Sequence, residues 1–110
     1  MIKISVEKRN NAYMRFVSRG HAEYAEEGQD IICAAVSALI ISAVNGLEAF
    51  TSEKFELRQE DGYVSVRFTE PTGEKGTLLM DTLVLGLTNI KNSYNPRYKQ
   101  RFLAIKVKEV

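Results

Sequence analysis

Alternation of apolar and polar residues marks five short segments of the chain as β-strands. In the first, Ile2, Ile4 and Val6 alternate with polar side chains, which is typical of a strand with one buried face. The other segments of this kind are 13–19, 54–58, 63–68 and 101–108. Asn10-Asn11 and Asp61-Gly62 separate two neighbouring pairs, and such residues tolerate positive φ, so the pattern predicts two β-hairpins.

Two longer segments have helical patterns. Residues 31–50 are apolar almost all round, which indicates a helix buried against the sheet and against a second surface. In residues 74–92, apolar positions recur at helical spacing, and Asn95-Pro96 is predicted to end the helix. The residues of this stripe are Leu79, Leu83, Gly86 and Ile90, widened by Met80, Val84 and Leu87.

The order of these elements is ββαββαβ. Alternating hairpins and helices predict an α+β fold, with a mainly antiparallel sheet of about five strands and two helices packed on it. With 110 residues, we expect a single domain over 1–110.

Charge and composition exclude several classes of protein. Fifteen basic and fourteen acidic residues give a net charge of +1, so no global field favours nucleic acid and direct RNA binding is not expected. The N-terminus shows no secretion signal, and the apolar run from Ile31 to Val44 is too short and too polar for a membrane span.

Basic residues nevertheless gather after residue 90. This pattern is typical of a solvated edge strand, and it also fits a weak RNA or ribosome contact. These residues are Lys91, Arg97, Lys99, Arg101, Lys106 and Lys108, opposed by Glu109.

The chain has one cysteine, Cys33, and one histidine, His21. They are too few for a structural zinc site or an internal disulfide, so we expect no metal, no cofactor and a reducing, cytoplasmic setting. Asp30 precedes the apolar run as a predicted helix N-cap. Cys33 then falls in the first turn, where the helix dipole favours a thiolate.

His21 follows the strand break at Gly20, and a loop of about nine residues can return its imidazole to the thiol. The residues alone leave another interpretation open, in which Cys33 is a small buried hydrophobe and His21 lies at the surface.

A longer motif bears on this choice. It comprises Gly20-His21-Ala22, a short loop ending in Gly28, and Asp30-Ile-Ile-Cys33-Ala-Ala-Val-Ser37-Ala-Leu39. This string resembles the signature of the ribosomal-processing cysteine proteases, the Prp family. The resemblance implies that His21 and Cys33 are catalytic and that Asp30 and Ser37 belong to the same motif. It also implies a substrate, the precursor of a large-subunit ribosomal protein that loses a short N-terminal extension behind a pair of aromatic residues.

The expected chemistry is that of a cysteine endopeptidase. Cys33 attacks the scissile carbonyl as a thiolate, His21 acts as general base, and an acyl-enzyme forms. Backbone N–H groups at the helix start, with Gly20 as a further donor, are expected to hold the oxyanion. Ser37 either bonds the thiol or bonds back to the Cys33 carbonyl.

The loop between the two catalytic candidates is acidic. Glu23, Glu26 and Glu27, with Gly28 as a flexible point, suggest a lid that attracts a basic substrate. The alternative is an ordinary solvated loop.

Two further expectations concern partners and rival functions. The second surface of the helix 31–50 predicts a homodimer. The rival function is a non-catalytic ribosome-associated binding protein that uses the basic C-terminal region, with Cys33 in the core. A thiol redox switch ranks behind both, because the chain has no second cysteine.

Overall fold

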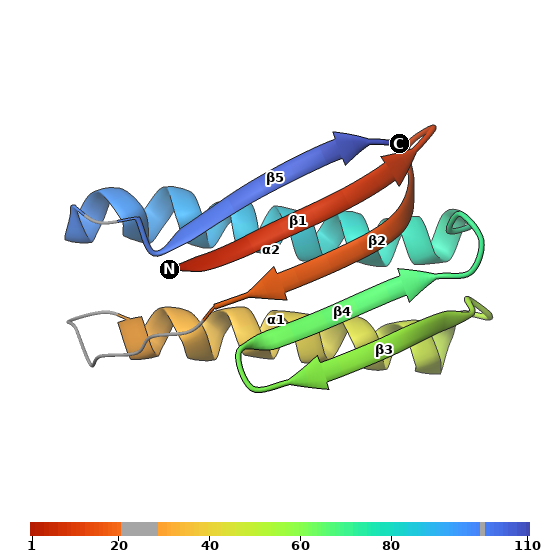
Figure 1. Ribbon diagram of the computed structural model, residues 1–110, viewed down its shortest axis with the longest axis horizontal. Helices are drawn as coiled ribbons and strands as arrows, with labels where there is room; N and C mark the ends of the chain where they lie inside the picture. Colours follow the sequence, from red (N-terminus) through yellow and green to blue (C-terminus); the bar gives the residue numbers. More distant parts are fainter. Residues whose placement is uncertain (21–28, 100) are drawn as a thin grey trace.

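The computed structural model describes residues 1–20, 29–99 and 101–110. In this part of the chain, five strands form one sheet and two helices cover one of its faces (Figure 1). The predicted α+β class and the order ββαββαβ are confirmed. The elements are β1 (Ile2–Arg9), β2 (Ala12–Arg19), α1 (Gln29–Phe50), β3 (Phe55–Glu60), β4 (Tyr63–Phe68), α2 (Glu74–Tyr98) and β5 (Leu103–Glu109).

The sheet has the strand order β3-β4-β2-β1-β5. Its pairings are antiparallel except at β1 and β5, which run parallel in register from Ile2 opposite Leu103. The parallel pairing arises because α2 carries the chain back across the sheet before β5 begins (Figure 1). β3 and β5 are therefore the two edge strands.

Both predicted hairpins are present. Asn10 and Asn11 have φ values of 51° and 69°, as a two-residue turn of type I′ requires. The β3–β4 turn contains Gly62 at φ 68°. Turn chemistry read from the sequence therefore placed both connections correctly.

The core lies between the sheet and the inner faces of both helices. From α1 it receives residues spaced three or four apart, as one helical face requires. Gly86 of α2 lets the helices approach, since a Cβ there would lie 2.9 Å from the Leu39 Cδ1 atom. The buried residues of the helices are Ile32, Val36, Ile40, Val44 and Leu47 in α1, and Met80, Leu83 and Leu87 in α2.

The outer face of α1 is open. Contrary to the sequence-based expectation, the segment Ile31–Phe50 is long and apolar enough to pass a composition test for a membrane span, although a soluble core helix passes the same test. Only 28% of the most apolar 18-residue stretch of this segment is buried. The described residues do not provide a second surface that covers the outer face of α1.

The end of α2 differs from the prediction. The helix does not stop before Asn95-Pro96 but includes Pro96 in its last turn, and Lys99 then ends it at φ 54°. Pro96 removes one intrahelical N–H donor, so the carbonyl four residues earlier loses its usual partner. The Asn95 side chain bonds the backbone of Phe102 and Leu103 at 2.9–3.3 Å, so it anchors the start of β5.

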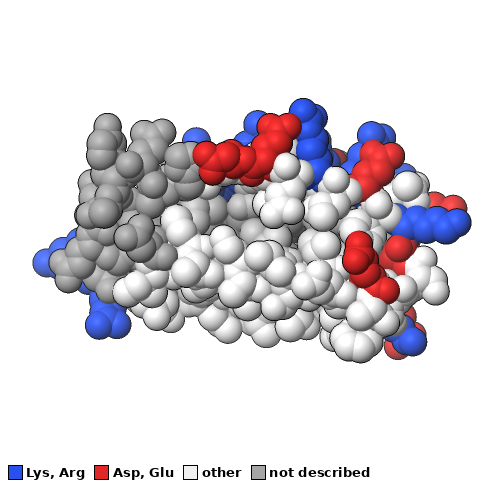
Figure 2. Space-filling model, turned by 90° about the horizontal axis from the view of Figure 1, so that it is seen from below, with Lys and Arg blue, Asp and Glu red and all other residues white. Residues whose placement is uncertain are grey.

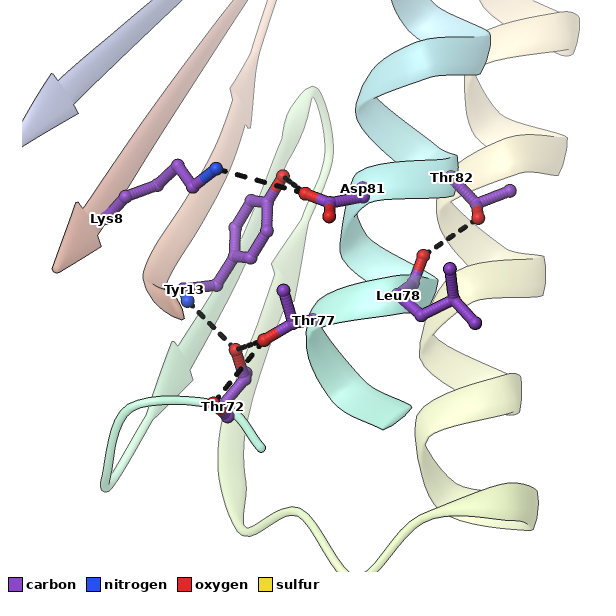
Figure 3. Close-up of polar contacts among 7 residues, drawn as sticks. All are labelled: Lys8, Tyr13, Thr72, Thr77, Leu78, Asp81 and Thr82. Atoms are coloured by element: carbon purple, nitrogen blue, oxygen red, sulfur yellow. Dashed lines mark hydrogen bonds and ion pairs between the residues drawn. The ribbon is translucent and has the colours of Figure 1, made fainter. Parts of the chain in front are cut away.

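A polar network ties the start of α2 to the first hairpin (Figure 3). The Tyr13 hydroxyl donates to the Asp81 carboxylate at 2.7 Å, and Lys8 Nζ lies 3.9 Å from the same group. The Thr72 hydroxyl accepts the Tyr13 backbone N–H at 2.9 Å and bonds the Thr77 hydroxyl at 2.7 Å. Burial, followed by the bond to Asp81, raises the pKa of Tyr13 well above its usual value.

Candidate functional site

Cys33 lies near the start of α1, as predicted, although the helix begins earlier than expected. Its first residue is Gln29, so Asp30 lies inside the first turn and is not the residue before the helix. Cys33 is then one turn into the helix, where its own N–H can bond the Gln29 carbonyl. The N–H groups that have no intrahelical partner belong to the residues just before it, at the end of the helix that Cys33 adjoins.

A cleft of about 360 Å³ contains the partly exposed Cys33. One wall is a single face of α1, and the opposite wall is the β3–β4 hairpin. Ile2, Ser18 and Gly20 close its end. The α1 wall consists of Cys33, Val36, Ser37, Ile40, Ile41, Val44 and Asn45, and the hairpin wall of Leu57 and 59–64. The predicted nucleophile thus borders a groove that continues along its own helix.

At the cleft, the edge of the hydrophobic core is incompletely packed. Leu57 stands opposite Val66 in the sheet register, so both point to the helix side. Val66 is 1% exposed, whereas Leu57 is 44% exposed, and Ile41 across the cleft is 51% exposed. Two large apolar side chains therefore face each other across open space, and an apolar group between them would complete the packing.

Sequence reasoning did not identify Leu57 and Ile41 as site residues. The alternation of β3 indicated that Leu57 faces the core. Its exposure follows from the position of β3 at the sheet edge, which the sequence pattern does not reveal.

Gly20 has a structural role that the sequence did not predict. Its φ is 102°, and its N–H donates to the Gly62 carbonyl at 2.9 Å. In this structure the N–H is therefore bonded within the fold, and the role of Gly20 in holding an oxyanion stays a prediction. A Cβ at this position would overlap the Met1 carbonyl oxygen. Gly20 joins the end of β2 to the β3–β4 turn and so closes the cleft.

Ser37 lies one turn after Cys33 and lines the same cleft. Its residue is exposed. Within the described part of the chain its hydroxyl bonds neither the thiol nor the Cys33 carbonyl, so it is available to a group entering the cleft.

The remaining predicted site residues lie outside the described residues. These are His21, Glu23, Glu26, Glu27 and Gly28. The structure accordingly describes one half of the predicted dyad. Across residues 1–20, 29–99 and 101–110, no three His, Cys, Asp or Glu side chains are grouped to hold a metal ion.

Comparison with known proteins supplies the family. The sequence matches the family model of cysteine protease Prp over residues 1–99. The chain belongs to this family. It is therefore a cysteine protease, as the motif around Cys33 predicted. Among the curated relatives, the ribosomal processing cysteine protease Prp of Mycoplasma pneumoniae is 34% identical over 97 residues, covering 86% of this chain and 87% of that protein.

Other relatives agree. The protein of the same name from Bacillus subtilis is 28% identical over 101 residues, covering 86% of this chain and 90% of that one. The crystal structure of the Prp protease from Staphylococcus aureus with a substrate peptide has a TM-score of 0.82 at 24% identity, with full coverage of both chains. SMU.848 from Streptococcus mutans has a TM-score of 0.79 at 31% identity, covering all of this chain and 96% of that one. These structures share the fold.

Proposed function

We propose that this protease removes a short N-terminal extension from a large-subunit ribosomal protein precursor. The main support for this proposal is the position of Cys33, near the N-terminal end of α1 and at the head of a peptide-sized cleft. The chain belongs to the cysteine protease Prp family. Relatives in this family are named for ribosomal processing.

In the proposed reaction, the Cys33 thiolate attacks the scissile carbonyl carbon and its electron pair moves to the oxygen. The N–H groups at the start of α1 stabilise that oxyanion. As the carbonyl re-forms, the C–N bond breaks and His21 gives the amine the proton it took from the thiol. Water then attacks the thioester, and hydrolysis releases the extension and returns the proton to Cys33.

Asp30 is proposed to act in the first turn of α1. A carboxylate in a first helical turn complements the helix dipole, and a negative charge close to a cysteine opposes formation of its thiolate. Asp30→Asn separates the two effects. Lost turnover with retained stability indicates a catalytic role, and parallel loss of both indicates that Asp30 acts only on the helix.

The extension is proposed to lie along the cleft, from Val44 toward Cys33. The eleven residues between these positions span about 16 Å of helix, which matches about five residues of extended peptide. A groove with two walls fits a flexible extension, and the folded part of the precursor stays outside. The apolar pair Ile41 and Leu57 then receives a substrate side chain about three or four residues before the cut, since Ile41 lies about 12 Å from Cys33 along the helix.

We further propose a cytoplasmic homodimer. No charged residue occurs between Asp30 and Glu48, and the helical surface in the view of Figure 2 is almost free of charge. Exposed Leu78 and Leu85 of α2, at 66% and 60%, extend the apolar helical surface. A second copy is the partner that covers such a face symmetrically. A reducing compartment keeps the single thiol active.

The deciding experiment is mass spectrometry of a synthetic precursor extension that continues past its aromatic pair. Wild type is expected to cut once, directly behind that pair, and Cys33→Ala to leave the peptide intact. Circular dichroism and peptide binding by the Cys33→Ala variant establish that it remains folded. Cleavage by Cys33→Ala would exclude the thiol mechanism, and an uncut peptide with wild type would exclude this substrate.

A further inference from the structure

The face of the sheet opposite the helices carries a concentration of charge that the net charge of +1 conceals. Figure 2 shows charged side chains along the sheet side, at the top of the view, above a helical side that carries few charges. The strand register assigns eight basic and three acidic residues to this open face. They are Lys3, Arg9, Arg15, Arg19, Arg58, Arg67, Lys106 and Lys108, with Glu7, Glu56 and Glu60.

Several of these basic residues stand next to one another in neighbouring strands, an arrangement that lowers the stability of the sheet. Arg15 stands directly opposite Arg67, and Arg19 directly opposite Lys3. Like charges at such positions destabilise a sheet. Among the described residues, Arg58 alone of the eight forms an ion pair, with Glu60 at 3.1 Å. Glu7 and Glu56 stand opposite Arg15 and Arg67 on their other sides without forming ion pairs with them, so an external anion would still relieve both repulsions.

Arg15 also has an unused donor. Its Nη2 donates to the Tyr63 hydroxyl at 3.5 Å, but its Nε is buried and has no hydrogen-bond partner within the described chain. Buried donors of charged groups are rarely left unbonded. Arg15 lines two hollows. One has a volume of about 210 Å³ and is also lined by Arg19, and the other has a volume of about 460 Å³ and is also lined by Arg67. Glu7 also lines both hollows and Glu56 the larger one, so Arg15, Arg19 and Arg67 stand there beside carboxylates as well as beside one another.

An aromatic ring lies beside these cations. Tyr63 has the Arg19 guanidinium 5.1 Å and the Arg58 guanidinium 6.0 Å from its ring centre. A hydrogen bond with Ser65, followed by Arg15, lowers the pKa of Tyr63. Single-stranded RNA binds such sheet faces by stacking bases on aromatic or guanidinium planes while cations hold its phosphates.

We propose that the open sheet face binds single-stranded RNA, with Arg15, Arg19 and Arg67 on phosphates and Tyr63 under a base. RNA is favoured over a lipid surface because exposed Leu57 and Val107 point to the helix side, and Val110 is the one large exposed apolar side chain that lines the hollows of this face. The cleft with Cys33 opens on the helix side of the β3–β4 hairpin. Arg15, Arg19 and Arg67 do not line the cleft, whereas Tyr63 also belongs to its hairpin wall, so the two sites share this one residue.

The test is fluorescence anisotropy of a labelled single-stranded RNA of about twelve nucleotides, a length within the usual site size. Three phosphate contacts predict a salt slope of roughly −2, since each contributes about 0.7 on a single strand. Arg15→Gln/Arg67→Gln is expected to weaken binding about tenfold and to reduce the slope by about 1.4. The matched control is Lys75→Gln/Lys91→Gln on α2, with the same charge change and unaltered binding.

Measurements of stability and of peptide cleavage show whether a loss of RNA binding comes from lost contacts or from a disturbed fold. Arg15→Gln/Arg67→Gln removes a like-charge pair, so its melting temperature should equal or exceed that of wild type, and its cleavage rate should not change. If both double variants weakened RNA binding equally, the effect would be due to overall charge, and the proposal would be overturned. Absence of salt-dependent RNA binding would overturn it too, as would binding to phosphatidylserine vesicles without binding to RNA.

Discussion

At the scale of single residues, Gly20 shows what a sequence pattern can and cannot supply. The break in alternation after Arg19 correctly predicted the end of β2. The motif also suggested Gly20 as an oxyanion donor, but its N–H bonds the Gly62 carbonyl. Residue type indicates which conformations are open to a glycine, whereas the partner of its N–H depends on a turn more than forty residues away.

Gly20→Ala should destabilise the protein. The residue has φ 102°, which strains any L side chain, and the new methyl group would overlap the Met1 carbonyl. We expect a loss of about 2 kcal/mol or more in the free energy of unfolding, measured by urea denaturation. Gly73→Ala is the control, because Gly73 has φ −78° and an open environment. An unchanged midpoint for Gly20→Ala would contradict the assigned role.

Leu57→Ala should alter peptide cleavage more than stability. If a substrate side chain is buried between Ile41 and Leu57, truncation removes about 1 kcal/mol of contact, or about fivefold in kcat/KM. The loss should appear only with peptides that carry leucine about three or four residues before the cut. Val107→Ala, on the opposite edge strand and 54% exposed, is the control. Equal effects on all peptides would exclude this subsite.

At the scale of elements, local signals predicted the hairpins and both helices, and long-range contacts decided the rest. Turn residues identified the connections at Asn10-Asn11 and Asp61-Gly62. Pro96 suggested the end of α2, yet the helix continues through it because Asn95 is held by the start of β5. The parallel pairing of β5 with β1 likewise depends on the route of α2 across the sheet, which periodicity does not encode.

The network around Tyr13 should make the docking of α2 sensitive to alkaline pH. The folded state raises the pKa of Tyr13, so it favours the neutral phenol. The resulting stability is complete below the unfolded pKa of about 10 and is lost as pH rises above it. Tyr13→Phe should cost about 1 kcal/mol at pH 7 and flatten the decline above pH 10 in thermal unfolding. The same decline in both proteins would assign it to other groups.

At the scale of the whole molecule, the sequence predicted the chemistry of the site better than its shape. The motif identified the family, because reactive residue types and their spacing are local in the chain. The cleft required β3 and α1 to meet at an open edge of the core, and the charge of the sheet face required the register of five strands. Neither property can be read from a net charge or from one segment alone.

The apolar helical side gives the last prediction. If a second copy covers it, Leu85→Glu places a carboxylate in the interface and should convert a dimer to a monomer at micromolar concentration, measured by size exclusion with light scattering. Val107→Glu adds the same charge at an exposed apolar position on the sheet edge, and it should leave the mass unchanged. The buried charge costs several kcal/mol, enough to shift the dissociation constant by at least a hundredfold. A wild-type monomer at that concentration would refute the dimer and leave the helical surface without a self-partner.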